Sequence, residues 1–190
     1  MAWGKGVCCP AFLHIAEEKN MPEERNTPED MTSALRRLLD ENAILDVMAR
    51  FDDAIIRRDV ETFRTLWVED GIWEIGQFNP AHVQDVQPLH AQGIEQLVAA
   101  LELFNRMNEF FFRTTLRGVI TLDGDHAIVR SPTTEYARRH DGHGYNNVAL
   151  YQDELVRRNG TWLFVARRYH YVWIDSVSPI AGNAVELPPL

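Results

Sequence analysis

The order of hydrophobic patterns along the chain is the feature that most limits its fold. Apolar residues follow helical spacing over residues 35–55, and a short helical pattern over residues 60–67 begins after Asp59, a favoured N-cap residue. Gly71 is expected to end this helix, so that residues 72–75 form a short strand. A third helical pattern follows, and strands fill the rest. Helices first and strands last favour an α+β fold, with helices on one face of a mostly antiparallel sheet.

Turn signals divide the rest of the chain into a loop, a helix and four strands. Residues 76–92 are predicted to be a long loop, and a helix is expected to open near Gln92 and to run to about Asn108. The four strands are expected over residues 110–122, 126–136, 145–157 and 161–173. Asp123-Gly124-Asp125 is expected to close one hairpin and Arg158-Asn159-Gly160 another.

The two ends of the chain differ in composition from its middle. Residues 1–30 are punctuated by proline and are largely charged after residue 17, which predicts an N-terminal extension that is flexible or packed on a neighbour. Thr27 and Asp30 resemble a capping box with Pro28 at the first helical position. The folded domain is therefore expected over residues 31–178, with residues 179–190 as a C-terminal tail.

Charge and cysteine content limit the partners and the compartment. A formal net charge of −9 argues against nucleic acid and against anionic membranes as partners, since both require a basic face. Cys8 and Cys9 are adjacent, which fits neither a disulfide framework nor a zinc site and indicates a reducing cytoplasm. No segment has the form of a transmembrane helix or a signal peptide. Abundant aromatic residues suit a core that also binds an apolar ligand.

Four local motifs together resemble the SnoaL-like branch of the nuclear transport factor 2-like superfamily, over about residues 31–175. They are Asn42–Val47 leading into Phe51 and Arg57-Arg58-Asp59, then Leu66–Trp73, then Leu122–Ala127, and finally Tyr151–Arg157 with Asn159–Trp162. The resemblance implies a cone-shaped barrel, in which a curved sheet wraps a long N-terminal helix and leaves an apolar pocket. Relatives include scytalone dehydratase, polyketide cyclases and ketosteroid isomerase, and this fold hosts unrelated activities.

The resemblance also implies where catalytic groups would stand, and this chain lacks them there. Dehydratase-like relatives place an Asp on the first helix beside a strand His, which moves a proton. Here the Asp position falls on Ile56, and the His position falls within Phe111–Thr114, where there is no histidine. The tyrosine and aspartate of ketosteroid isomerase fall on Phe51 and near Ile75. The usual dyad is therefore expected to be absent.

Other polar residues are the candidates to replace that dyad. Asp52 lies one helical turn before Ile56 and on the same face, so we expect Asp52 and His170 to form an acid–base pair. Strand alternation would place His170 with Trp162 and Phe164. Arg113 or Tyr151 would stabilise oxyanion charge. Each candidate has a structural alternative: Asp52 would pair with an arginine or cap a strand, Arg113 would lie on the outer face of the sheet, and Tyr151 would pack in the core. An inward Arg113 would either bind an oxyanion or neutralise Asp52.

The predicted substrate pocket combines apolar residues with two polar ones. Glu135 would be a buried acid if it faces inward, and His90 and His82 lie in the long loop that tends to cover the pocket. The pocket residues are Phe51, Ile55, Ile56, Trp73, His90, Phe111 and Glu135. A metal site needs three or four convergent ligands, and the single loop with His140, Asp141 and His143 is weak evidence for one, so neither a metal nor another cofactor is expected.

Two functions remain open at this stage. One is a cofactor-independent lyase, isomerase or cyclase that acts by acid–base catalysis on a hydrophobic cyclic small molecule of polyketide, steroid or aromatic type. The other is a non-catalytic module of the same fold that binds a small molecule or serves in an assembly, as a dioxygenase small subunit does. The resemblance also implies a homodimer or homotrimer.

Overall fold

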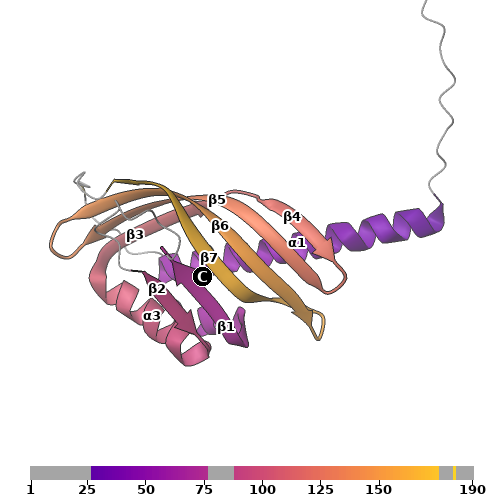
Figure 1. The fold of residues 1–190 in the computed structure, drawn as a ribbon, viewed down its shortest axis with the longest axis horizontal. Helices are drawn as coiled ribbons and strands as arrows, with labels where there is room; N and C mark the ends of the chain where they lie inside the picture. The colour runs from indigo at the N-terminus through magenta and orange to yellow at the C-terminus, as the bar shows by residue number, and fades with distance from the viewer. Residues whose placement is uncertain (1–26, 77–87, 176–181, 183–190) are drawn as a thin grey trace, which may run out of the picture.

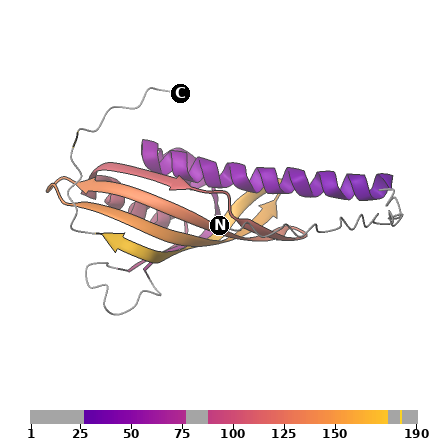
Figure 2. The ribbon, with the colours of Figure 1, turned by 90° about the horizontal axis from the view of Figure 1, so that it is seen from above.

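The computed structural model describes residues 27–76, 88–175 and 182, and it has helices on one face of a curved sheet (Figure 1). The long helix α1 (Pro28–Arg57) lies along the inside of the curve, and its N-terminal part extends past the sheet (Figure 2). The predicted α+β fold is therefore confirmed. The predicted extension, apart from residues 27–30, and the predicted tail, apart from Gly182, lie outside the described residues, and the domain limits stay a prediction.

Local sequence sets the start of α1 and of the short helix that follows it. Thr27 accepts a hydrogen bond from the Asp30 N–H, and the Asp30 carboxylate accepts one from the Thr27 N–H, so the predicted capping box is confirmed. Asp59 caps α2 (Val60–Thr65), as predicted, by accepting a hydrogen bond from the Thr62 N–H.

The C-terminal half of α1 packs against the sheet. Its buried residues are Ile44, Val47, Met48, Phe51, Ala54 and Ile55, which share one helical face. Along the N-terminal half, large apolar side chains such as Leu35 and Leu39 are exposed instead. In the part of the chain that is described, no helix combines the length and the apolar character needed to cross a membrane.

Seven strands form one sheet in the order β2-β1-β7-β6-β5-β3, with β4 paired to β5. In chain order the strands are β1 (Trp67–Ile75), β2 (Leu89–Gln92), β3 (Asn108–Thr115), β4 (Val119–Asp123), β5 (His126–Arg139), β6 (Gly144–Arg158) and β7 (Thr161–Asp175). β1 and β7 run parallel, and the other pairs are antiparallel. β2 and β3 end the sheet on opposite sides, so the sheet curves without closing into a barrel (Figure 1).

Two predictions around β1 were wrong. Gly71 does not end a helix: β1 already begins at Trp67, and its register with β7 shifts between Trp67 and Ile72, which hides the alternation around the glycine. Residues 89–92 were predicted in a loop, but they form β2 and pair with β1. A four-residue strand is too short to show a period, and it is the partner strand that holds it extended. Residues 77–87, with His82, lie outside the described residues.

The strand predicted over residues 110–122 is two strands. β3 and β4 lie one after the other along the same edge of β5, separated by residues 116–118. Gly118 explains the close approach at this break, because a Cβ atom there would lie 2.4 Å from the Arg130 carbonyl oxygen. Both predicted hairpins are confirmed, with Asp123 opposite His126 and Arg158 opposite Thr161.

The core lies between the concave face of the sheet, α1, α2 and α3 (Ile94–Met107). The convex face of the sheet carries a different set of side chains, and several large apolar ones are exposed there. They include Phe112, Tyr136, Val148, Leu150 and Trp173. Such a face suits association, and the expected homodimer or homotrimer stays a prediction.

Candidate functional site

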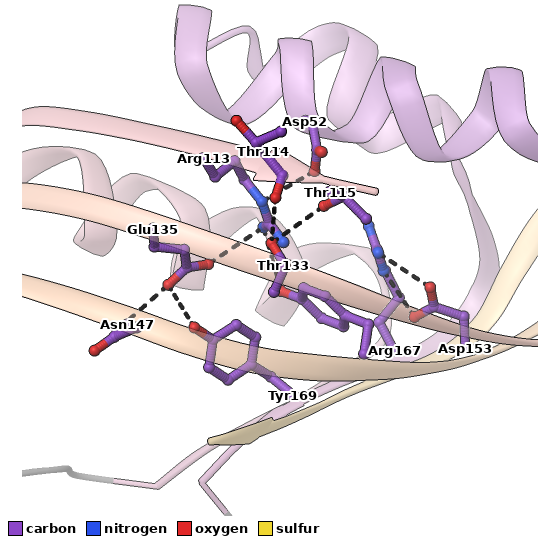
Figure 3. A network of polar contacts seen from close by, with 11 residues as sticks. Asp52, Arg113, Thr114, Thr115, Thr133, Glu135, Asn147, Asp153, Arg167 and Tyr169 are labelled. Carbon is purple, nitrogen blue, oxygen red and sulfur yellow. Dashed lines mark hydrogen bonds and ion pairs between the residues drawn. The ribbon is translucent and has the colours of Figure 1, made fainter. Parts of the chain in front are cut away.

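Charged side chains lie inside the curve of the sheet, among residues that are otherwise mostly apolar. Asp52 points from α1 toward the sheet, Arg113 comes from β3 and Glu135 from β5 (Figure 3). Only 1% of the Arg113 side chain is exposed, against 15% for Asp52 and 11% for Glu135. The cation is thus covered, and the two carboxylates reach further toward solvent.

Arg113 is held by three oxygens. Its Nε lies 3.0 Å from Oδ1 of Asp52, an ion pair whose angle is not that of a hydrogen bond. Its Nη1 donates a hydrogen bond to the Tyr151 hydroxyl at 3.3 Å and lies 3.7 Å from Oε1 of Glu135. Burial opposes the charge on Arg113, but Tyr151, Asp52 and Glu135 outweigh it and raise the pKa of the guanidinium. Arg113 therefore stays cationic.

Glu135 is held by neutral donors on the opposite side from Arg113. The Tyr169 hydroxyl donates a hydrogen bond of 2.9 Å to Oε2 of Glu135, and the Asn147 amide donates one of 3.4 Å to the same oxygen (Figure 3). Tyr145 and Tyr171 also interact electrostatically with Glu135. One carboxylate is therefore fixed among tyrosine side chains at the inner face of the sheet.

A second ion pair lies deeper. Arg167 on β7 donates two hydrogen bonds to Asp153 on β6, at 2.9 and 3.0 Å, and both side chains are fully buried. The Arg167 guanidinium also lies 4.0 Å from the ring centre of Phe51 and 4.1 Å from that of Tyr151. Burial raises the pKa of the Asp153 carboxyl, and Arg167 opposes that shift. The pair is locked by its neighbours, which suits a structural role.

Four tyrosines in this region predict a loss of stability at alkaline pH. Burial raises the pKa of Tyr145, Tyr151, Tyr169 and Tyr171 above the ordinary value of 10.0. The folded chain then keeps protons that the unfolded chain releases above about pH 10. Stability should be complete below that pH and should fall above it. In a pH titration, tyrosinate absorbance should rise together with the loss of circular dichroism. Full tyrosine ionisation in a chain with native circular dichroism would contradict this.

The structure brings together most of the predicted catalytic residues but not His170. Asp52, Arg113 and Tyr151 lie in one cluster, whereas His170 lies on the other face of the sheet. The register of β6 and β7 shifts between Glu154 and Leu155, so β7 carries one extra residue there and its alternation reverses. The expectation that His170 shares a face with Phe164 was therefore wrong, and Tyr169 faces inward instead.

The predicted pocket residues also divide. Phe51, Ile55 and Trp73 are buried in the core, and Phe111 packs on Phe104 of α3 with ring centres 4.6 Å apart. Ile56 is only half-buried. His90 was expected on a loop over the pocket, but it lies on β2 and its Nδ1 is 3.0 Å from Glu74 Oε1, on the convex face. The pairing of β2 with β1 fixes that orientation.

Sequence reasoning missed the residues that hold Glu135 and the deeper ion pair. The register shift in β7 places Tyr169 and Arg167 on the inner face of the sheet, which strict alternation does not predict. Asp153 and Asn147 left a signal, because they occur at alternate positions with Tyr151, whose face they share.

At the loop after β5, His143 Nδ1 lies 3.1 Å from Asp141 Oδ1 with both side chains exposed. No group of three metal-ligating side chains occurs among the described residues.

A family model described as a SnoaL-like domain matches residues 36–168. The chain belongs to the SnoaL-like family. The match covers α1 from residue 36, all of β3, β5 and β6, and β7 as far as residue 168. No curated protein matches the sequence of this SnoaL-like protein.

Solved structures share the fold of this SnoaL-like protein at low sequence identity. A hexachlorocyclohexane dehydrochlorinase, LinA type 2, has a TM-score of 0.66 and 18% identity, with 83% of this chain and 99% of that chain covered. A protein from Novosphingobium aromaticivorans, provisionally named a scytalone dehydratase, has a TM-score of 0.64 and 19% identity, with 80% and 97% covered. An NTF2-like protein with a cystatin-like fold from the same species has a TM-score of 0.64 and 20% identity, with 78% and 92% covered. At these identities the likeness establishes the fold alone.

Proposed function

We propose that this SnoaL-like protein is a cofactor-independent acid–base enzyme of the lyase, isomerase or cyclase type, with Glu135 as the group that moves the proton. The observation that carries the proposal is the fixed, nearly buried carboxylate of Glu135, held by Tyr169 and Asn147 beside the cationic Arg113. A carboxylate held in one position and shielded from water is suited to proton transfer. The substrate is a hydrophobic cyclic small molecule. The dehydrochlorinase and dehydratase names of two structural neighbours support an elimination.

The surrounding groups have distinct roles in this proposal. Glu135 removes a proton from carbon, the electrons of that C–H bond form the new double bond, and the leaving group departs with its bonding pair. Tyr145 and Tyr171 are half-buried, and their raised pKa values keep them protonated as donors to a developing negative charge. Asp52 is a positioning residue that holds Arg113, and Arg113 in turn faces Glu135. Glu135 replaces His170 as the partner expected within the site.

The proposal is tested by Glu135→Gln, which removes the base and keeps the shape of the side chain. β-Tetralone in deuterium oxide is the probe, because exchange of its acidic carbon-bound protons reports on base catalysis. The native protein should accelerate the exchange over buffer, and Glu135→Gln should lower that rate by about 10²–10⁴-fold. Nuclear magnetic resonance measures the exchange. Chloride release from hexachlorocyclohexane separately tests for elimination.

Glu102→Gln is the matched control, since Glu102 lies on α3 with half of its side chain exposed, and it should leave the exchange rate unchanged. Exchange at the buffer rate with the native protein, or an unchanged rate in Glu135→Gln, would contradict the proposal.

The second candidate function, a non-catalytic binding module, is favoured by the apolar side chains of Ile56 and Phe111 at the family's catalytic positions. Ligand binding without any turnover would support that alternative.

A further inference from the structure

The charged cluster of Asp52, Arg113 and Glu135 is negative on the side that solvent reaches. Asp52 and Glu135 flank the single cation Arg113, so these three side chains carry one net negative charge. The Arg167–Asp153 pair adds no net charge. Because Arg113 is 1% exposed and the carboxylates are 15% and 11% exposed, an incoming molecule meets carboxylate before it meets guanidinium.

An unpartnered acceptor lies beside the same carboxylate. Asn147 is 5% exposed, and its amide nitrogen donates to Glu135. This contact fixes the orientation of the amide, and no described residue donates a hydrogen bond to its Oδ1 atom. An amide oxygen left buried without a donor is unfavourable, so a ligand that brings N–H groups would satisfy it.

Aromatic rings complete the surroundings of Glu135. The rings of Tyr169 and Tyr171 are 4.8 Å apart at their centres in an edge-on arrangement, and the rings of Tyr151 and Tyr169 are 5.0 Å apart. Aromatic faces attract cations, most strongly where water is excluded. A further cation, Arg139, acts on Tyr145 and Tyr171, but it is exposed and therefore screened by solvent.

We propose that the site takes a protonated amine, with the ammonium group of the ligand held by the Asn147 carbonyl oxygen and the tyrosine rings and attracted by the net negative charge of Asp52, Arg113 and Glu135, so that Glu135 stays available as the base. This inference names the substrate class of the proposed function and rests on the same site. An ammonium group supplies three N–H donors and the positive charge that the cluster lacks. A ligand carboxylate would instead add a negative charge beside Asp52 and Glu135, and a neutral molecule would leave the charge uncompensated. The net charge of −9 on the chain also attracts cations.

Three probes of one skeleton test the inference by binding alone: β-aminotetralin, β-tetralol and tetralin-β-carboxylate. Isothermal titration calorimetry on the full chain should show the amine binding at least about tenfold more tightly than the alcohol, and the carboxylate binding most weakly. The preference for the amine should shrink as salt is added. Glu135→Gln should remove most of this preference and leave the affinity for β-tetralol unchanged.

Tyr171 gives a second variant that leaves the carboxylates in place. Tyr171→Phe keeps the ring and Tyr171→Leu removes it, so the leucine variant should bind the amine about threefold or more weakly than the phenylalanine variant. Asp53→Asn is the control for lost charge, because Asp53 is an exposed neighbour of Asp52 that pairs with Arg57. It should change neither affinity nor selectivity.

Several results would overturn the inference. They are equal or weaker binding of the amine relative to the alcohol, an amine preference that survives Glu135→Gln, and no detectable binding of β-aminotetralin. Failure of the proposed function gives a different result, in which the amine binds with dependence on Glu135 but the native protein catalyses no proton exchange.

Discussion

Replacing Asp153 with alanine is expected to lower the free energy of unfolding by about 3–5 kcal/mol. Asp153 is the only described carboxylate hydrogen-bonded to Arg167, and neither side chain of the pair is exposed. Without Asp153 the guanidinium would be a buried charge with aromatic rings as its main remaining contacts. Urea denaturation followed by circular dichroism measures the change.

A double variant separates the cost of breaking the pair from its net value. Arg167→Met with Asp153→Leu removes both charges at similar volume, and it should recover most of the stability lost in Asp153→Ala, because an apolar pair needs no compensation for lost hydration. The exposed pair of Arg50 and Asp46 is the control: Asp46→Ala should cost no more than about 1 kcal/mol. A loss below about 1 kcal/mol in Asp153→Ala would show that water or a neighbour replaces the carboxylate.

Phe51→Ala is expected to destabilise the protein by a similar amount, about 3–5 kcal/mol. Phe51 is fully buried and lies 5.5 Å from the ring centre of Phe63 and 5.8 Å from those of Trp73 and Phe164. Its ring also lies against Arg167. Alanine would remove the ring at the point where α1 meets the sheet and would leave a cavity beside a buried charge. The free energy of unfolding in urea is again the measurement.

Phe112→Ala provides the matched control for Phe51→Ala. Phe112 is 45% exposed on the convex face, so its replacement should change the free energy of unfolding by about 0.5 kcal/mol or less in the isolated chain. Equal losses in the two variants would mean that the convex face is covered in solution. A small loss in Phe51→Ala would show that the surrounding rings collapse into the space.

The fold was predictable where a local signal is strong. Thr27 and Asp59 cap their helices through contacts within three residues, so the sequence alone reveals them. The turns at Gly124 and Gly160 have positive φ, which glycine adopts without strain, and both hairpins could be predicted from them. β2 could not be predicted in the same way, because its four residues are held by pairing with β1.

The site was less predictable, because the side chains that meet depend on which face of the sheet each strand residue points to. One extra residue in β7 turned Tyr169 and Arg167 inward and His170 outward. Strict alternation along β7 therefore does not predict which of its residues faces Asp52 and its neighbours. Arg113 and Glu135 lie on neighbouring strands in direct register, and that proximity depends on a pairing that no local pattern specifies.

The sequence by itself determined the order of most elements, the family and the presence of polar residues in otherwise apolar strands, because these depend on local spacing and residue type. Only the tertiary structure decided that Asp52, Arg113 and Glu135 come together, that Tyr169 holds Glu135, and that His170 lies on the convex face. The physical reason is that a register shift in a long strand reverses the side chains that follow it, up to the next shift. The pairing of distant strands sets that shift.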